Sequence, residues 1–242
     1  MDETQPAIRL GTFQTRGVAV VFGASGGIGG ALYKALLASD RFDHVVPLSR
    51  GSSPSIDLLD EASLERATAF AASKGEIRLV IDATGFLHDE GQGPEKSWRQ
   101  MDAAKLAHAF AINAIGPALI MKHVLPLLPR SGKSVFATLS ARVASIEDNR
   151  LGGWYSYRAS KAALNQLVRT AAVELKRRSA DAICVALHPG TVATALSAPF
   201  SKDGLEIQSA QASAARLLEV IDHLSPAQTG GFFDHLGATI AW

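Results

Sequence analysis

Hydrophobic and polar positions change their pattern repeatedly along this chain. Short apolar runs, the first of them Val18–Phe22, alternate with longer stretches in which apolar residues recur every three or four positions. The short runs are typical of buried strands, and the longer stretches are typical of amphipathic helices. We predict strands at 18–22, 44–48, 77–81, 135–139, 183–187 and 231–234, and helices at 26–39, 60–74, 101–128, 155–178 and 209–224.

This alternation predicts the fold class. Strands that are separated by helices pair in parallel, because each helix returns the chain to the same end of the sheet. The strand runs are apolar at successive positions, which predicts helices on both faces of the sheet. We therefore expect one α/β domain, a Rossmann-type doubly wound parallel sheet, over residues 17–242, with residues 1–16 as an N-terminal extension.

The composition acts mainly by exclusion. The 242 residues are 47% hydrophobic and 19% charged, which excludes wholesale disorder. Lys and Arg number 24 against 23 Asp and Glu, so the net charge of +1 gives no reason to expect a nucleic-acid partner. The one cysteine, Cys184, excludes an internal disulfide and fits a reducing compartment, so we expect a cytoplasmic protein.

Membrane and metal binding are not expected either. Residues 1–16 contain no apolar segment of the kind that a signal peptide needs. The longest apolar stretches are interrupted by Asn, Gly, Pro, Lys or His, so we expect no transmembrane helix. The seven histidines are scattered without a His-x-x-x-His pair, and we predict no metal site.

A glycine-rich loop follows the first strand and opens the first helix. The sequence Gly23-Ala-Ser-Gly-Gly-Ile-Gly29 places glycines where backbone N–H groups can approach a pyrophosphate at a helix N-terminus. We assign Gly23, Ser25, Gly27, Ile28 and Gly29 to a dinucleotide site. A plain tight turn is the alternative, but the strand before the loop and the helix after it favour the cofactor interpretation.

Ser49 and Arg50 end the second strand, where dinucleotide-binding folds hold the adenosine ribose. An acidic residue at this point would accept hydrogen bonds from a free 2′-hydroxyl, whereas a serine beside a guanidinium suits a 2′-phosphate. The pair therefore favours NADP, with NADPH preferred over NADH. The alternative is an arginine that is simply solvated.

Tyr157 and Lys161 share one face of a predicted helix because they are four residues apart. A phenol with its ordinary pKa of about 10 is a poor acid–base group at neutral pH. An ammonium beside it favours the phenolate, so we expect Lys161 to lower the pKa of Tyr157. Such a pair can supply a proton in a reduction and accept one in an oxidation. A surface pair without function is the alternative, but the glycine loop upstream favours the enzymatic interpretation.

Together these motifs resemble the short-chain dehydrogenase/reductase family over residues 17–242. The segment Asp148-Asn-Arg-Leu-Gly-Gly-Trp-Tyr-Ser-Tyr157 and the ending Gly231-Phe-Phe-Asp234…Trp242 further resemble the branch of C-factor-like proteins and sniffer-type carbonyl reductases. The resemblance implies an NADP(H)-dependent carbonyl reductase or alcohol dehydrogenase that acts on a small molecule as a homodimer or homotetramer. Residues 193–209 are expected to form a flap that shapes the substrate pocket.

The resemblance also implies roles for single residues. Asn113 matches the asparagine that holds a relay water near the lysine, and Lys161 would also bind the nicotinamide ribose. Asp57 and Leu58 match the pair that contacts the adenine. Asp82-Ala-Thr-Gly85 stands where the family usually has Asn-Asn-Ala-Gly, which leaves the role of Asp82 open. Further cofactor contacts fall on Ala83, Thr84, Gly85, Pro189, Gly190, Val192 and Thr194.

The catalytic serine departs from the family pattern. The family usually ends this strand with Ser-Ser and uses the second serine to polarise the substrate carbonyl, whereas this chain has Ser140-Ala141. Ser140 lies one residue early and Ser145 four residues late, and either hydroxyl could hydrogen-bond a developing alkoxide. We assign Ser140, with a turn serine as the alternative. The altered motif keeps a second function open, a cofactor-binding regulatory or signalling protein with little turnover.

Overall fold

The computed structural model describes residues 8–88, 93–194 and 207–242. Six strands form the central sheet in the order β2-β1-β3-β4-β5-β8, and every pairing is parallel. The strands are β1 (Val18–Phe22), β2 (His44–Leu48), β3 (Ile77–Asp82), β4 (Ser134–Leu139), β5 (Ala182–His188) and β8 (Phe232–Asp234). The predicted Rossmann-type parallel sheet is therefore confirmed.

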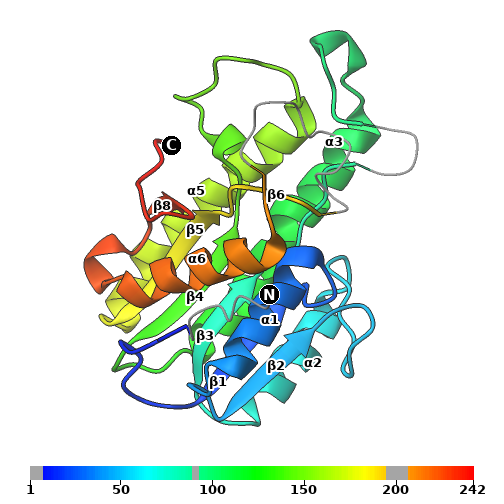
Figure 1. Cartoon of the computed structure of the whole chain (residues 1–242). Coiled ribbons are helices and arrows are strands. Elements are labelled where there is room, and N and C mark those ends of the chain that lie inside the picture. The colour runs from blue at the N-terminus through cyan, green and yellow to red at the C-terminus, as the bar shows by residue number, and fades with distance from the viewer. Residues whose placement is uncertain (1–7, 89–92, 195–206) are drawn as a thin grey trace, which may run out of the picture.

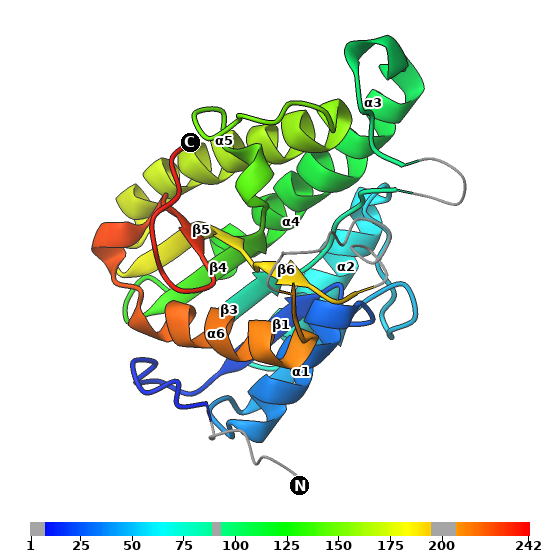
Figure 2. The same ribbon diagram turned by 45° about the horizontal axis from the view of Figure 1, so that its top comes forward.

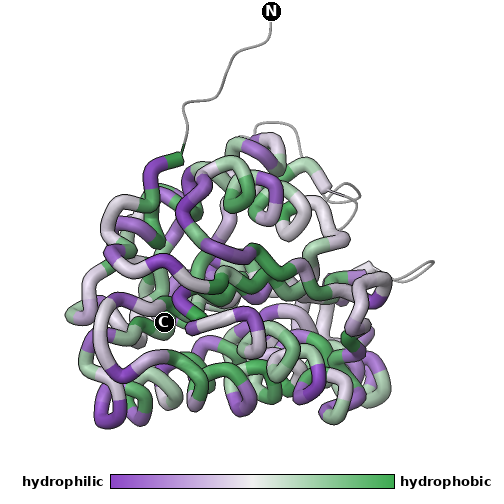
Figure 3. The backbone as a smooth tube through the Cα atoms, turned by 90° about the horizontal axis from the view of Figure 1, so that it is seen from below, coloured by the Kyte–Doolittle hydropathy of each residue, from purple (hydrophilic) through white to green (hydrophobic). Residues whose placement is uncertain are grey.

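Helices cover both faces of this sheet, as Figure 1 and Figure 2 show. Val20 and Phe22 of β1 pack toward one layer of helices, and Ala19 and Val21 pack toward the other, because side chains alternate along a strand. Figure 3 shows hydrophobic stretches of the chain running through the interior of the domain. The first layer is α2 (Glu61–Ala72), α4 (Gly116–Val124) and α5 (Tyr155–Arg178), and the second is α1 (Gly27–Ala38) and α6 (Ala210–His223).

The predicted helix over 101–128 is a continuous helical path with an irregular middle. α3 (Ala103–Phe110) runs into a π-helical turn, η2 (Ala111–Ile115), then into α4, and ends in the 3₁₀ turn η3 (Leu125–Leu127). A π-turn inserts an extra residue into the helix and is frequent at functional sites. Asn113, one of the predicted site residues, lies in this turn.

The same stretch bears on the expectation that the chain has no transmembrane helix. By length and composition alone, Ala103–Leu127 is long and apolar enough to do so. The polar and helix-breaking residues that interrupt it do not lower its hydropathy enough to exclude a span. In the structure, α3 packs against α5 and α4 packs against α2, so the stretch forms part of one helical layer of the domain.

Shorter elements complete the described chain. β6 (Thr191–Val192) pairs in parallel with β7 (Ile207–Gln208) in a separate small sheet. Three more 3₁₀ turns are η1 (Trp98–Gln100), η4 (Arg142–Ala144) and η6 (Pro226–Gln228). Leu10 and Phe13 of the N-terminal extension are buried in the core beside α1 and α6. Residues 1–7 of the extension and 195–206 of the expected flap lie outside the described residues.

The strand order indicates where this sheet would bind a ligand, namely at the carboxyl ends of its strands. From β1 the chain moves to β2 on one side, and β3 then returns to the other side of β1. The connections that leave the carboxyl ends of β1 and β3 therefore run in opposite directions. Open α/β sheets bind their ligands between two such connections. The glycine loop and the Asp82–Gly85 segment both begin at these carboxyl ends.

Candidate active site

The glycine loop is packed too tightly for any side chain at two positions. A Cβ atom on Gly29 would lie 2.2 Å from the carbonyl oxygen of Gly23, and one on Gly23 would lie 2.9 Å from that of Ala83. Gly23 also has a φ of 78°, in the left-handed region that favours glycine. Backbone contacts alone therefore require glycine at both positions.

The N-terminus of α1 is exposed. Its cap residue, Gly26, has no side chain that could cap the helix, and Ser25, Gly26 and Gly27 are exposed. The first N–H groups of the helix and the positive end of its dipole therefore face outward. A Cβ atom on Gly27 would lie 2.8 Å from the Thr194 methyl group, so the 189–194 loop forms the opposite wall. These groups fit the pyrophosphate of a dinucleotide.

The residues predicted for the adenosine end lie beyond the carboxyl end of β2. The N–H of Gly23 donates to the carbonyl of Leu48 at 2.8 Å, which fixes this end beside the glycine loop. Arg50 is exposed, and its guanidinium makes no hydrogen bond or ion pair within the described ranges. Asp57 accepts a hydrogen bond from the N–H of Leu59 at 2.9 Å, and Leu58 packs against the core.

Tyr157 and Lys161 lie one turn apart at the start of α5. Lys161 is only 3% exposed, and its Nζ donates to the carbonyl oxygen of Leu139 at 2.8 Å. A Cβ atom on Gly85 would lie 3.5 Å from this Nζ and 3.6 Å from Oδ1 of Asn113. The fold therefore brings together the ends of β3 and β4, the π-turn and the first turns of α5.

Asn113 fastens the segment that follows β3 to this helix. Its side-chain Oδ1 accepts from the N–H of Phe86 at 2.7 Å, and its Nδ2 donates to the carbonyl of Phe86 at 2.8 Å. The same Nδ2 donates to the hydroxyl of Ser160 on α5 at 3.1 Å. All of these groups are buried or half-buried, so the amide holds the wall beside Tyr157 in a fixed position.

Burial is the main cause of the pKa shifts of Tyr157 and Lys161. Burial raises the pKa of Tyr157 to about 12 and lowers that of Lys161 to about 8, because low-polarity surroundings disfavour both phenolate and ammonium. The expected lowering of the Tyr157 pKa by Lys161 is therefore wrong for this structure, in which the ammonium donates to the Leu139 carbonyl instead. At neutral pH the phenol is protonated and the ammonium is charged.

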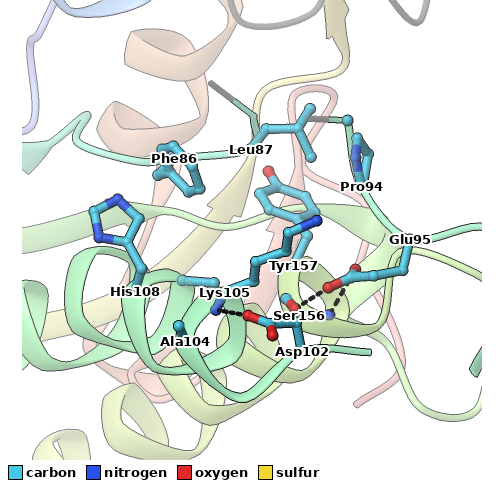
Figure 4. Close-up of a pocket in the computed structure, with 12 residues that line it drawn as sticks. Phe86, Leu87, Pro94, Glu95, Asp102, Ala104, Lys105, His108, Ser156 and Tyr157 are labelled. Atoms are coloured by element: carbon cyan, nitrogen blue, oxygen red, sulfur yellow. Dashed lines mark hydrogen bonds between the residues drawn. The ribbon is translucent and has the colours of Figure 1, made fainter. Parts of the chain in front are cut away.

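A cavity of about 420 Å³ opens beside Tyr157. In Figure 4 the Tyr157 ring lies between Leu87 and the side chain of Lys105. Apolar walls with a few polar groups are typical of small-molecule sites. Within the described ranges, no three His, Cys, Asp or Glu side chains gather as a metal site. The cavity is lined by Phe86, Leu87, Gly93, Pro94, Glu95, Asp102, Ala104, Lys105, His108, Ala109, Ser156 and Tyr157.

Glu95 is a site residue that no sequence motif indicated. It is 4% exposed, and its carboxylate accepts hydrogen bonds from the N–H of Ser156, at 3.1 Å, and from the Ser156 hydroxyl. Burial, the largest single influence, raises its pKa, but the hydrogen bonds from Ser156 and from its own backbone, together with the charge of Lys105, hold the pKa below its ordinary value. Because Trp154 provides no side-chain cap for α5, Glu95 satisfies the first turn instead. A long-range contact of this kind leaves no signal in local sequence.

The serines near the end of β4 differ in their surroundings. Ser145 accepts from the N–H of Asp148 at 3.1 Å and donates to the carbonyl of Trp242 at 3.4 Å, so its hydroxyl is engaged locally. Ser140 is also buried, but its hydroxyl has no hydrogen-bond partner within the described residues. Of the two hydroxyls, only that of Ser140 is therefore not already hydrogen-bonded to a nearby backbone group in the described residues.

Comparison with known proteins agrees with this fold. A family model described as Enoyl-(Acyl carrier protein) reductase matches residues 37–224. The chain belongs to the short-chain dehydrogenase/reductase family of oxidoreductases, which confirms the predicted family.

Two relatives and one solved structure illustrate the similarity. C-signal of Myxococcus xanthus is 37% identical over 177 residues, which are 73% of this chain and 99% of that protein. The 1-hydroxy-2-glutathionyl-2-methyl-3-butene dehydrogenase of Rhodococcus sp. is 32% identical over 190 residues, covering 78% of this chain and 79% of that protein. The NADPH-bound carbonyl reductase from chicken fatty liver is 25% identical with a TM-score of 0.81, covering 94% of this chain and 100% of that one.

Proposed function

We propose that this chain is an NADP(H)-dependent oxidoreductase that interconverts a carbonyl and an alcohol on a small molecule, with Tyr157 as general acid and base. The observation that carries this function is the Tyr157–Lys161 pair: Tyr157 lines the cavity, and Lys161 lies beside Gly85 at the carboxyl end of the sheet, where the glycine loop also begins. When bound, the cofactor supplies or accepts the hydride. The residues that would hold it are Gly23, Ser25, Gly27, Ile28, Gly29, Ser49, Arg50, Asp57, Leu58, Ala83, Thr84, Gly85, Asn113, Tyr157, Lys161, Pro189, Gly190, Val192 and Thr194.

The chain's own residues handle the proton. In the reduction, Tyr157 donates its hydroxyl proton to the substrate oxygen as that oxygen becomes negative. Because its pKa is about 12, the phenol still carries this proton at neutral pH when the substrate binds. The Lys161 ammonium, which donates to the Leu139 carbonyl, and the Asn113 amide support the relay that returns a proton to Tyr157. In the oxidation the Tyr157 phenolate accepts the proton of the alcohol.

Turnover of a panel of aldehydes and ketones with NADPH tests this function. We expect NADPH consumption with at least one compound, together with formation of the matching alcohol. NADPH binding without turnover of any compound would favour the alternative, a cofactor-binding regulatory or signalling protein. Ala141 at the position of the family's catalytic serine favours that alternative, and so does the similarity to C-signal.

Arg50→Ala is expected to weaken NADPH binding by roughly 10–150-fold and to leave NADH binding nearly unchanged. A hydrogen bond to a charged group contributes about 1.5–3 kcal/mol, and about 1.4 kcal/mol corresponds to a factor of ten. Ser49→Asp should weaken NADPH binding further, because a carboxylate repels the 2′-phosphate. Both cofactors should be titrated into both variants at two salt concentrations, since salt screens an exposed charge. An equal loss for NADH and NADPH would show that Arg50 does not recognise the phosphate.

Ser140→Ala and Ser145→Ala are expected to differ. If Ser140 polarises the carbonyl, its loss should cost about 10²–10³-fold in kcat, as loss of one oxyanion-hole donor does. Ser145→Ala should leave kcat nearly unchanged, because its hydroxyl bonds only nearby backbone groups. Steady-state kinetics of both variants decide the matter. If both changes are silent, neither serine polarises the carbonyl, and Asn113 and Tyr155 become the next candidates.

The quaternary structure and the location belong to the same proposal. We infer a homodimer or homotetramer in the cytoplasm. The resemblance places such interfaces at the helices over 101–128 and 155–178. These helices carry exposed apolar side chains, with Ile115 on the π-turn and Leu167 and Val173 on α5. Contiguous exposed apolar surface is a feature of protein–protein contacts. The single, buried Cys184 fits a reducing compartment.

A further inference from the structure

Asp82 is a fully buried carboxylate directly beneath the active site. It ends β3, it is 0% exposed, and it is paired across the sheet with Thr138 of β4. Its carboxylate accepts hydrogen bonds from the N–H of Thr84 at 3.0 Å, the Thr84 hydroxyl at 2.6 Å and the Thr138 hydroxyl at 2.7 Å. These donors are neutral, and a buried charge is costly unless an opposite charge also lies near it.

The opposite charge comes from Lys161. Thr138, the cross-strand partner of Asp82, is followed directly by Leu139, whose carbonyl accepts the Lys161 ammonium. From the other side, Gly85 lies three residues after Asp82, and a Cβ atom on it would lie 3.5 Å from Nζ of Lys161. The groups that bind the Asp82 carboxylate and the groups nearest to the Lys161 ammonium therefore belong to the same two short segments, at the ends of β3 and β4.

Few other groups compete for this ammonium. The described groups that face it from the π-turn, from the loop after β3 and from β4 are the Asn113 amide, Gly85 and the Leu139 carbonyl, and all are uncharged. Tyr157, on its own helix, is neutral below a pKa of about 12. Burial lowers the pKa of Lys161 to about 8, and Asp82 is the charged group that raises it.

We propose that Asp82 is a positioning residue of the active site, whose buried carboxylate keeps the neighbouring Lys161 ammonium charged and bound at the end of β4. This role presupposes the proposed proton transfer by Tyr157. It explains what the carboxylate does at a position where the family resemblance leads one to expect asparagine. Without it, Lys161 would be a buried ammonium with one carbonyl partner, and it would lose its proton at a lower pH.

Asp82→Asn tests this role without a change of shape. The amide oxygen can accept from Thr84, and the amide nitrogen can donate to the Thr138 hydroxyl, which is free to rotate. Thr138→Val is the matched control, because it removes one hydrogen bond to the carboxylate but leaves the charge. The readout is the pH profile of kcat/KM with NADPH and an aldehyde from the panel.

In Asp82→Asn the alkaline limb of this profile should move to lower pH by about one pH unit or more, the effect expected for an opposite charge within a few ångströms. At a pH above both limbs, kcat/KM should be about tenfold lower than in the wild type for each pH unit by which the limb moves, while at lower pH it should match the wild type. Thr138→Val should keep the position of the limb. An unchanged limb in Asp82→Asn, or an equal displacement in both variants, would overturn the role of Asp82.

A second measurement does not depend on turnover. The pKa of Lys161 can be measured by NMR on protein with isotope-labelled lysine, with Lys161→Met used to assign the signal. We expect a lower pKa in Asp82→Asn than in the wild type or Thr138→Val, and no difference would again overturn the proposal. If the pKa moves but no carbonyl compound is reduced, the link between Asp82 and Lys161 holds and the proposed function fails. If Asp82→Asn does not fold, Asp82→Ser replaces it in both measurements.

Discussion

Tyr157→Phe is expected to abolish carbonyl reduction and to leave NADPH binding intact. Phenylalanine fills the same space and keeps the edge contact with the Trp154 ring, whose centroid lies 6.1 Å away. It cannot donate a proton to the substrate oxygen. General acid catalysis typically contributes roughly 10²–10⁴-fold, so kcat should fall by at least that order.

Tyr33→Phe is the control for this change. Tyr33 lies on α1 and is not among the residues that line the cavity, so removal of its hydroxyl should leave kcat within a few-fold of the wild type. NADPH affinity, measured by fluorescence titration, should be the same in both variants and in the wild type. If Tyr157→Phe still reduces carbonyls at a rate close to that of the wild type, Tyr157 is not the acid.

Gly29→Ala is expected to cost both cofactor binding and stability. The new methyl group would lie 2.2 Å from the Gly23 carbonyl oxygen, and no rotamer change can relieve the clash because the backbone fixes the positions of both atoms. Overpacking of this kind costs typically about 1–3 kcal/mol. If the loop moves to relieve the clash, the N–H groups at the start of α1 lose their alignment, and NADPH affinity should fall by roughly 10–150-fold.

Gly11→Ala is the control for this substitution. A Cβ atom on Gly11 would meet nothing within 4 Å, so neither the melting temperature nor the NADPH affinity should change appreciably. Thermal unfolding and NADPH titration of both variants provide the comparison. Normal NADPH affinity in Gly29→Ala would mean that the close approach of Gly23 and Gly29 does not shape the cofactor site.

Much of the architecture follows from local sequence. The alternation of apolar runs and amphipathic stretches predicts each strand of the sheet, and the observed ends differ by only one or two residues, as for β3 (Ile77–Asp82) and α1 (Gly27–Ala38). This works because the side-chain periods of strands and helices are fixed by backbone geometry. The glycine loop and the spacing of Tyr157 and Lys161 are local as well, so the sequence places both at the start of helices.

Other features depend on contacts between distant segments. The π-turn at Asn113 interrupts a pattern that reads as one helix, because its amide bonds Phe86 and Ser160, which lie far away in the chain. The cap that Glu95 provides for α5 is equally non-local. Leu10 and Phe13 complete the core from an N-terminal segment that reads as a separate extension.

The sequence by itself determined the fold, the glycine loop and the placing of Tyr157 and Lys161 on one helical turn, because each depends on residues close together along the chain. Only the tertiary structure decided the electrostatic state of that pair. The sequence places an ammonium one turn from a phenol, which predicts a lowered phenol pKa. The fold surrounds both groups with low-polarity packing, which raises the Tyr157 pKa instead, and the Asp82 carboxylate counters the lowering of the Lys161 pKa. Burial and the sign of the nearest charge are properties of packed segments, so no spacing along the chain can predict them.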